Sequence, residues 1–424
     1  MLFQVKLQVK GAELNKRKIL NDPVYGFITI SHELIFDLIE HPLMQRMRRI
    51  QQLGLSNLVY PGAQHTRFHH ALGAVHLMSK AIQTLRSKGQ DISEAEAEAA
   101  TAAILLHDIG HGPFSHALET AIVSHVGHED ISLLIMQELN KELHGRLDLA
   151  IQIFTGQYSK QFLCNLVSGQ LDVDRLDYLI RDSYFTGVHE GVIGYDRLIE
   201  MMDVVGDELV IEQKGIYSVE KFIVSRRLMY WQVYLHKTVL CAEQMLIRIL
   251  RRAKYLVRAG MQLEATPALH FFLKNDVDRH SFVSGSAALG HFAMLDDSDI
   301  YVALKYWMNS KDQVLSLLSR ALVNRQLFKI EMGNEPIPAA RIKEVTAQVK
   351  RHYNIEDDFD LQYFVFHETT SNSAYRLGDK NIRIRKKDGS LADVTEVSDH
   401  LHLAALADTV VKHYLCYPKT LPQP

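Results

Sequence analysis

The stretch LLHDIGHGPFSH, residues 105–116, decides how the rest of this sequence is interpreted. Its adjacent His107 and Asp108 offer one imidazole and one carboxylate. Neighbouring residues can bind the same divalent cation only where a helix breaks, and Gly110 and Gly112 are expected to supply that break. The stretch therefore predicts a metal site at the end of a helix.

Histidines gather around this stretch. Nine of the 22 histidines fall between residues 65 and 128, far more than an even distribution would place there. Histidine is the commonest metal ligand and titrates nearest to neutral pH. We interpret the cluster as a candidate site, and we expect three of its members to be ordinary packed or exposed residues: His69, His76 and His125.

Three further stretches complete the pattern: TRFHHALG (66–73), GHED (127–130) and LDVDRLDYLIRD (171–182). An upstream histidine and a downstream aspartate could join the His-Asp pair in a shell of two imidazoles and two carboxylates. Such a mixed nitrogen and oxygen shell suits Mn, Fe, Co, Ni or Zn better than Ca. We therefore expect one divalent transition metal.

Residues 171–182 are expected to be helical. In a helix, Asp174, Tyr178 and Asp182 follow one another at intervals of four and share one face, which we predict meets the pocket. Asp172 and Asp177 lie off that stripe, and we interpret them as solvated or capping carboxylates.

The order of these motifs resembles that of a known family. HDIGHGPFSH, TRFHH, GHE and LDVDRLDY resemble the HD-domain phosphohydrolases, specifically the dNTP triphosphohydrolase branch with its dGTPases and SAM-and-HD-domain enzyme. The resemblance extends over about residues 20–240. It implies a mainly α fold with an all-helical HD core, and four metal ligands: His70, His107, Asp108 and Asp174.

The resemblance also implies roles for other residues. His116 would be the general acid, with His111 as the alternative, and His128 and Glu129 would orient the network. Another set would hold the phosphates, the sugar or the base: Arg67, Gln52, Leu53, Tyr178, Asp182, Arg226, Tyr234 and Lys237. Tyr234 is expected to pack on C2′ and exclude ribonucleotides.

The reaction implied by the resemblance is attack of water on the α-phosphorus of a dNTP, which releases deoxynucleoside and tripolyphosphate. Mg²⁺ is considered as a companion of the substrate triphosphate. Two alternatives stay open: an HD phosphatase or phosphodiesterase acting on another nucleotide, and a non-catalytic sensor of nucleotides or nucleic acid. The cyclic-dinucleotide branch is disfavoured, because the chain has HDIGH rather than HDIGK and lacks a GYP element.

Partners follow from the same resemblance. Family members form dimers or tetramers, so we expect a homo-oligomer. Glu40, Gln45 and Arg48 match positions that read an activating guanine nucleotide at a subunit contact, although the family has aspartate where this chain has Glu40. Alternatively, Arg48 and its neighbours Arg46 and Arg49 pair with acidic residues on a nearby helix. A net charge of −3 does not favour nucleic acid as the main partner.

Length and composition predict the organisation. The chain has 424 residues, of which 47% are hydrophobic and 23% charged, which excludes a disordered protein. We expect an arm or small sheet over residues 1–30, a helical HD domain over 31–320 and an α+β appendage over 321–424. Smaller expected elements are a β excursion at 203–217, a helix at 339–352, a strand at 359–368 and a hairpin turn at Asp388-Gly389.

Cysteine usage and hydropathy predict the compartment. The three cysteines lie far apart with no C-x-x-C, which is typical of neither a disulfide framework nor a cysteine zinc site. No stretch approaches the roughly 20 apolar residues that cross a bilayer. We expect a cytoplasmic protein without a membrane partner.

Overall fold

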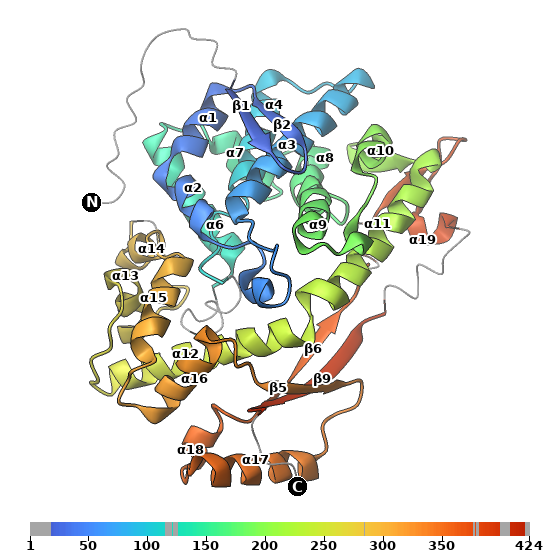
Figure 1. Ribbon diagram of the computed structural model, residues 1–424. Coiled ribbons are helices and arrows are strands. Elements are labelled where there is room, and N and C mark those ends of the chain that lie inside the picture. The colour runs from blue at the N-terminus through green and yellow to red at the C-terminus, as the bar shows by residue number, and fades with distance from the viewer. Residues whose placement is uncertain are drawn as a thin grey trace.

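Three helices form the centre of the molecule, which is a computed structural model describing residues 18–114, 121, 126–283, 285–375, 378, 381–398 and 408–419. They are α3 (Arg67–Ser87), α4 (Glu94–Leu106) and α9 (Val173–Thr186). α3 packs against both α4 and α9 (Figure 1). The fold is mainly α, as the sequence predicts.

The ends of α4 are set by its own sequence. Ser93 Oγ accepts a hydrogen bond from the backbone N–H of Glu96, and the Glu96 carboxylate accepts one from the backbone N–H of Ser93. This confirms the expected capping box. The Ala-rich body is buried almost throughout, and the helix ends at Leu106 with His107 as its C-cap. A locally specified helix thus delivers His107 at a fixed place.

An N-terminal hairpin and further helices surround this centre. β1 (Lys18–Asp22) and β2 (Gly26–Ile30) are antiparallel, and β2 packs on α1 and α3. The other helical elements described up to residue 200 are α1 (Glu33–Glu40), α2 (Pro42–Arg46), η1 (Met47–Arg49), η2 (Gly54–Leu58), α6 (His128–Glu142), α7 (Asp148–Phe154), α8 (Gln161–Val167), η3 (His189–Gly191) and α10 (Tyr195–Glu200).

The chain then leaves the central helices and their neighbours through a long helix. After η4 (Gln213–Gly215) and α11 (Ile216–Met229), a π-helical turn, η5 (Tyr230–Tyr234), precedes α12 (Lys237–Arg258). α12 runs beneath the central helices (Figure 1) and packs against α13 and α16 of the next group of helices. That group contains α13 (Pro267–Lys274), α14 (Ala287–Phe292), α15 (Asp297–Trp307) and α16 (Gln313–Val323).

Two sheets contain the remaining strands. β3 (Met202–Val205) and β4 (Glu208–Glu212) confirm the expected β excursion, and β7 (Arg383–Arg385) and β8 (Leu391–Asp393) confirm the hairpin at Asp388-Gly389. The order is β3-β4-β7-β8, with β7 parallel to β4. The C-terminal region therefore completes a sheet that begins within the first 320 residues, and the expected boundary at residue 320 stays a prediction.

The second sheet has the order β5-β9-β6, formed by β5 (Lys329–Gly333), β6 (Phe366–Asn372) and β9 (Val410–Tyr417). The expected helix is α17 (Ala339–Tyr353). The expected strand at 359–368 is partly wrong, because α18 (Asp358–Leu361) forms where Asp357 Oδ1 accepts from the backbone N–H of Phe359 at 2.8 Å. α19 (Val394–Val397) follows β8.

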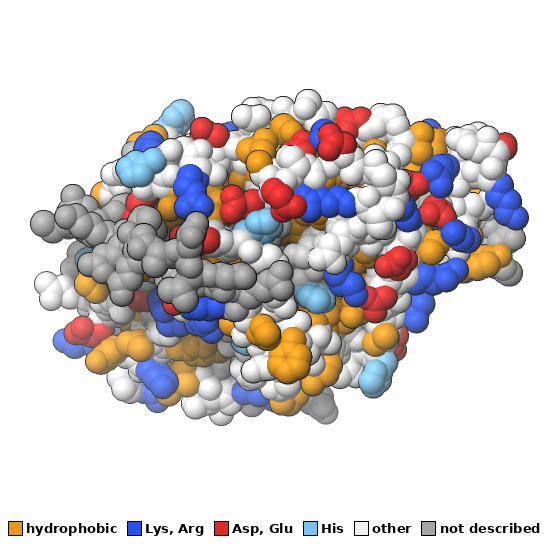
Figure 2. All heavy atoms as spheres, turned by 90° about the horizontal axis from the view of Figure 1, so that it is seen from above, with side chains coloured by type: hydrophobic (Ala, Val, Ile, Leu, Met, Phe, Trp, Pro, Cys, Tyr) orange, Lys and Arg blue, Asp and Glu red, His pale blue; other side chains and the backbone are white. Residues whose placement is uncertain are grey.

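The visible surface carries charges of both signs interspersed (Figure 2), in keeping with the near-neutral composition. Within the described ranges, no helix combines the length and the apolar character needed to cross a membrane.

Candidate metal centre and active site

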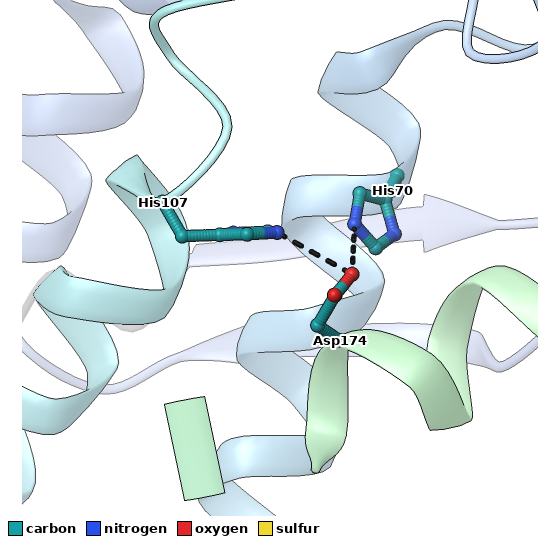
Figure 3. A group of neighbouring side chains, drawn as sticks. All are labelled: His70, His107 and Asp174. Atoms are coloured by element: carbon teal, nitrogen blue, oxygen red, sulfur yellow. Dashed lines mark ion pairs between the residues drawn. The ribbon is translucent and has the colours of Figure 1, made fainter. Parts of the chain in front are cut away.

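Three side chains from the three central helices converge on one point. His70 comes from α3, His107 from the end of α4 and Asp174 from the first turn of α9 (Figure 3). Asp174 Oδ1 lies 3.0 Å from His70 Nε2 and 3.4 Å from His107 Nε2. All three could bind one metal ion.

The donor set fits a cation. His70 Nδ1 lies 2.7 Å from Asp177 Oδ2, and His107 Nδ1 lies 2.7 Å from the carbonyl oxygen of Ile104. Because each Nδ1 is engaged, each Nε2 is the ring nitrogen left to bind a cation, and in the described part of the chain neither of these buried Nε2 atoms has a hydrogen-bond partner. Ligands about 2.1 Å from a shared cation and about 90–110° apart stand roughly 3.0–3.4 Å from each other. The observed separations match that spacing.

Asp108 borders this group. Its Oδ1 lies 3.5 Å from His107 Nε2 and its Oδ2 lies 3.8 Å from His70 Nε2. The guanidinium of Arg67 donates to Asp108 Oδ2. Asp108 also forms a second group with ligand geometry, together with His111 and His128. The four residues expected to bind metal are thus neighbours. One of them, Asp108, also accepts a hydrogen bond from Arg67 and belongs to the second group.

Gly110 has a different role from the one expected. A Cβ built there would lie 2.2 Å from the carbonyl oxygen of His128 and 2.3 Å from the backbone nitrogen of Ser132. Ser132 Oγ accepts from the N–H of Gly110 at 2.9 Å and donates to the carbonyl of His107 at 2.8 Å. The glycine therefore lets α6 approach the metal-binding loop closely, which brings His128 beside it.

The electrostatics of the site are governed by burial and by paired charges. Burial disfavours the charged form of His70, but the carboxylates of Asp174 and Asp177 outweigh it and raise the pKa of His70 to about 10. For Asp174, the two histidines outweigh burial and lower its pKa. Burial and the nearby Arg67 lower the pKa of His111 to about 3. The site thus gathers negative charge where a cation would bind.

His111 and His128 form a stacked pair, with ring centroids 3.9 Å apart. His111 is buried, His128 is half-buried and Glu129 is exposed in the first turn of α6. His116, the expected general acid, lies outside the described residues, as does His125. His69 has a local role, because its Nδ1 accepts from the N–H of Thr66 at the start of α3.

One face of α9 carries a second set of contacts. Asp182 Oδ1 lies 2.7 Å from His65 Nε2, and its Oδ2 accepts from the hydroxyl of Tyr234 at 2.8 Å. Tyr178 and Tyr234 pack edge to face with centroids 6.0 Å apart. The structure brings these three predicted substrate residues together, and Tyr234 is positioned by the π-helical turn, a distortion frequent at functional sites.

The interpretation of Asp177 as a solvated or capping residue is wrong. Asp177 is fully buried and binds both His70 and Arg181, whose Nε and Nη2 donate to it at 2.9 Å. Asp172 is a capping residue, since its Oδ1 accepts from the N–H of Arg175 at 2.8 Å, but it is also fully buried. Both faces of this turn of α9 are therefore covered.

The cavity at the site has a volume of about 440 Å³. It is lined by His107, Asp108 and Asp174, and by residues of α7 and α8 that the sequence did not single out, such as Phe154 and Val167. The other predicted substrate residues are elsewhere among the described residues: Gln52 and Leu53 before η2, Arg226 on α11, and exposed Lys237 at the start of α12.

Arg175 is a residue that sequence reasoning missed. It lines the cavity, pairs with Asp172, and has a buried Nε without a hydrogen-bond partner in the described part of the chain. The available signal in the sequence was its position directly after Asp174, because a cationic side chain there can contact the same substrate as a metal held by Asp174.

Two of the three predicted regulatory residues, Gln45 and Arg48, are in contact with each other. Glu40 ends α1 and is exposed. Gln45 Oε1 accepts from Arg48 Nε at 2.8 Å, and the Arg48 guanidinium lies 3.7 Å from the centre of the Phe68 ring. Of the three arginines, Arg49 pairs with an acidic residue, as the alternative predicted, whereas buried Arg46 binds backbone carbonyls instead.

Comparisons with known proteins identify the domains of this chain. The sequence matches the HD domain over residues 67–178 and the HD associated region over residues 193–264. It is 33% identical to the uncharacterized protein YwfO of Bacillus subtilis, covering 97% of this chain and 94% of that protein.

Two further similarities bear on the branch. The chain is 31% identical to the deoxynucleoside triphosphate triphosphohydrolase SAMHD1 homolog of Dictyostelium discoideum, over 58% of this chain and 51% of that protein. Its structure is similar to the crystal structure of a phosphohydrolase from Bacteroides thetaiotaomicron, with a TM-score of 0.92, 55% identity, and coverage of 95% of this chain and 100% of the other. With its HD motif and these relatives, the chain belongs to the HD-domain phosphohydrolases.

Proposed function

We propose that this phosphohydrolase converts dNTPs to deoxynucleoside and tripolyphosphate. The observation that carries the proposal is the convergence of His70 Nε2 and His107 Nε2 on Asp174, at a cavity that His107 and Asp174 line. A bound divalent transition metal, namely Mn, Fe, Co, Ni or Zn, would supply Lewis acidity and lower the pKa of water. Asp108 would complete the ligand set.

Side chains of the protein would supply the proton that the leaving oxygen needs. Cleavage at the α-phosphorus leaves a negative charge on the departing oxygen, so a proton donor nearby speeds the reaction. We assign this role to His116, with His111 as the alternative. His128, stacked on His111, and Glu129 would orient these imidazoles.

Other residues would bind the nucleotide. A triphosphate carries about four negative charges, which arginine forks and an ammonium group neutralise best. We assign Arg67, Arg226, Lys237 and the newly identified Arg175 to the phosphates. The packed cluster of Tyr178, Asp182 and Tyr234 would hold the sugar, with Gln52 and Leu53 next to it, and Mg²⁺ would accompany the triphosphate.

The deciding experiment is incubation of the purified protein with Mn²⁺ and each dNTP, followed by ion-exchange separation of the products. Deoxynucleoside and tripolyphosphate support the proposal. Release of pyrophosphate or phosphate instead identifies another HD nucleotide hydrolase. Nucleotide binding without any product identifies a sensor, and His107→Ala serves as the negative control in each assay.

We further propose that the protein is a homo-oligomer, as expected for this family, and that Glu40, Gln45 and Arg48 bind an activating guanine nucleotide. The adjacency of Gln45 and Arg48 at the surface supports this, since the pair offers planar hydrogen-bonding groups to a base edge. Sedimentation and turnover measured with and without GTP, in the native protein and in Arg48→Ala, test it. Identical values in all four conditions reject regulation.

We also infer a reducing, cytoplasmic setting, because Cys164, Cys241 and Cys416 are all buried as cysteine thiols.

A further inference from the structure

The first turn of α15 touches two active-site segments that lie far from it in sequence. Asp297 Oδ1 accepts from the backbone N–H of Phe114 at 3.0 Å, and Asp297 Oδ2 accepts from the backbone N–H of Gln51 at 2.8 Å. Asp297 is 5% exposed, and both partners are backbone amides. One carboxylate therefore bridges the end of the HDIGHGPF segment and the segment that leads to Gln52.

Burying a carboxylate costs folding free energy unless the group is paired with a cation or hydrogen-bonded. Asp297 makes no ion pair among the described residues, so its burial is not offset by a salt bridge. Burial raises the pKa of Asp297 to about 7, although the two amide donors oppose the rise. By contrast, its neighbour Asp296 caps α15 and pairs with Arg49, which accounts for that residue structurally.

The backbone at Phe114 is strained. Its φ is +53°, in the left-handed region that a non-glycine residue enters only at an energetic cost. Such a conformation persists only where the surroundings impose it. Asp297 holds the Phe114 amide, and Tyr301, one turn along α15, packs edge to face on the Phe114 ring at 5.3 Å.

Buried Arg46 anchors the other end of the same loop. Its Nη1 donates to the carbonyl of Ile109 at 3.3 Å and its Nη2 to that of His111 at 2.9 Å. Its Nε donates to the carbonyl of Leu295, two residues before Asp297, at 2.6 Å. The loop from Ile109 to Phe114 is thus attached at one end, through Arg46, to Leu295 just before α15, and at the other end to Asp297 in the first turn of α15.

We propose that Asp297 is a positioning residue that fixes the conformation of the 109–114 loop relative to the 50–52 segment. The 109–114 loop contains His111 and precedes His116 by two residues in the sequence. The 50–52 segment ends at Gln52. The effect on turnover rests on the proposed function, whereas the effect on the loop does not. Because small misplacements of reacting groups are costly, losing the bridge should lower kcat far more than it changes KM.

The variants are Asp297→Ala, which removes both acceptors, and Asp297→Asn, which keeps one acceptor oxygen and turns an amide N–H₂ toward the other donor. The matched control is Asp312→Asn. Asp312 is a poorly exposed aspartate in the same group of helices, which caps α16 through Leu315 and pairs with Arg252. Within the described ranges its hydrogen bonds and ion pair go to neither active-site segment, so it reports the cost of losing a poorly exposed carboxylate in this group of helices.

Amide hydrogen exchange of the full-length protein gives the first readout. Faster exchange in peptides covering 109–114 and 50–54 in both Asp297 variants, but not in Asp312→Asn, supports the proposal. Unchanged exchange there, or the same increase in the control, overturns it. This readout holds even if the native protein hydrolyses no dNTP, which would reject only the proposed function.

Turnover gives the second readout. Asp297→Asn should lower kcat about 10- to 100-fold with full metal content and a KM within about threefold of the native value, and Asp297→Ala should be at least as slow. Asp312→Asn should keep native kcat below its melting temperature. An active native enzyme whose kcat is unaltered in Asp297→Asn would overturn the positioning role.

Discussion

His70 Nδ1 lies 2.7 Å from Asp177 Oδ2, and both side chains are completely buried. Arg181 holds Asp177 in turn, and Asp22 of the N-terminal hairpin accepts from Arg181 Nη1 at 2.8 Å. This chain of contacts fixes the ring of His70 so that its Nε2 faces Asp174. The metal centre is therefore supported from the hairpin through two buried ion pairs.

Asp177→Asn tests this support. The amide can no longer act as a charged acceptor for the His70 ring, so we expect metal affinity to fall about 10- to 100-fold, the usual effect of losing such a partner. Metal titration measures it. Asp203→Asn is the control, because Asp203 is also buried and paired with an arginine, Arg385, but lies in β3. Equal affinities in the two variants would contradict the prediction.

Loss of a ligand should remove metal and hydrolysis together. In His107→Ala, Asp174→Ala or Asp108→Ala, one donor is lost, and with it both affinity and activated water. Metal analysis of the purified variants, alongside turnover with dNTPs, measures both effects. A variant that retains stoichiometric metal and normal turnover would remove that residue from the ligand set.

The two candidate acids should differ in kinetics. We expect His116→Ala to keep metal and substrate affinity while kcat falls roughly 10²- to 10⁴-fold, the usual contribution of a positioned acid. Single-turnover kinetics with a dNTP measure it. Should His111→Ala show that profile and His116→Ala not, the two roles must be exchanged.

Tyr234 should control the choice of sugar. A ring packed on C2′ leaves no room for a hydroxyl, so Tyr234→Ala should raise the rate with NTPs relative to dNTPs. Tyr234→Phe keeps the ring and loses only the hydrogen bond to Asp182, so it should retain most of the discrimination. Competition between dGTP and GTP measures the ratio. Equal rates in the native protein would refute this role.

Glu96 should stabilise the fold in a pH-dependent way. Burial favours its protonated form, but donors from Lys160, Tyr158 and Ser93 outweigh this and lower the pKa of Glu96 to about 2. A lowered carboxyl pKa adds stability above the unfolded value of about 4.3, and that stability is lost as pH falls toward 2. Glu96→Gln should therefore cost up to roughly 3 kcal/mol at pH 7, and less at pH 3.

Urea denaturation at the two pH values measures the free energy of unfolding. Glu94→Gln is the matched control in the same helical turn, because Glu94 is 79% exposed and its ion pair with Arg86 is expected to contribute under about 1 kcal/mol. A cost of Glu96→Gln that is the same at pH 7 and pH 3 would contradict the assignment.

Local features could be predicted from the sequence alone. The capping box of Ser93 and Glu96, the end of α4 at His107 and the turn at Asp388-Gly389 depend on residues within a few positions of one another, so their spacing is enough to predict them. The order of His and Asp motifs was likewise sufficient to indicate the HD family and its metal chemistry, because each ligand lies on an element with a recognisable pattern.

Only the tertiary structure decided the roles of Asp177, Gly110 and Asp297. Helical periodicity separates the faces of α9 but cannot tell which neighbour covers each face, and α3 covers Asp177, at a place where a Cβ on Gly73 would lie 1.9 Å from its Oδ1. Asp297 meets amides 183 and 246 residues away in the chain. Such contacts depend on how distant elements pack, which no local pattern encodes.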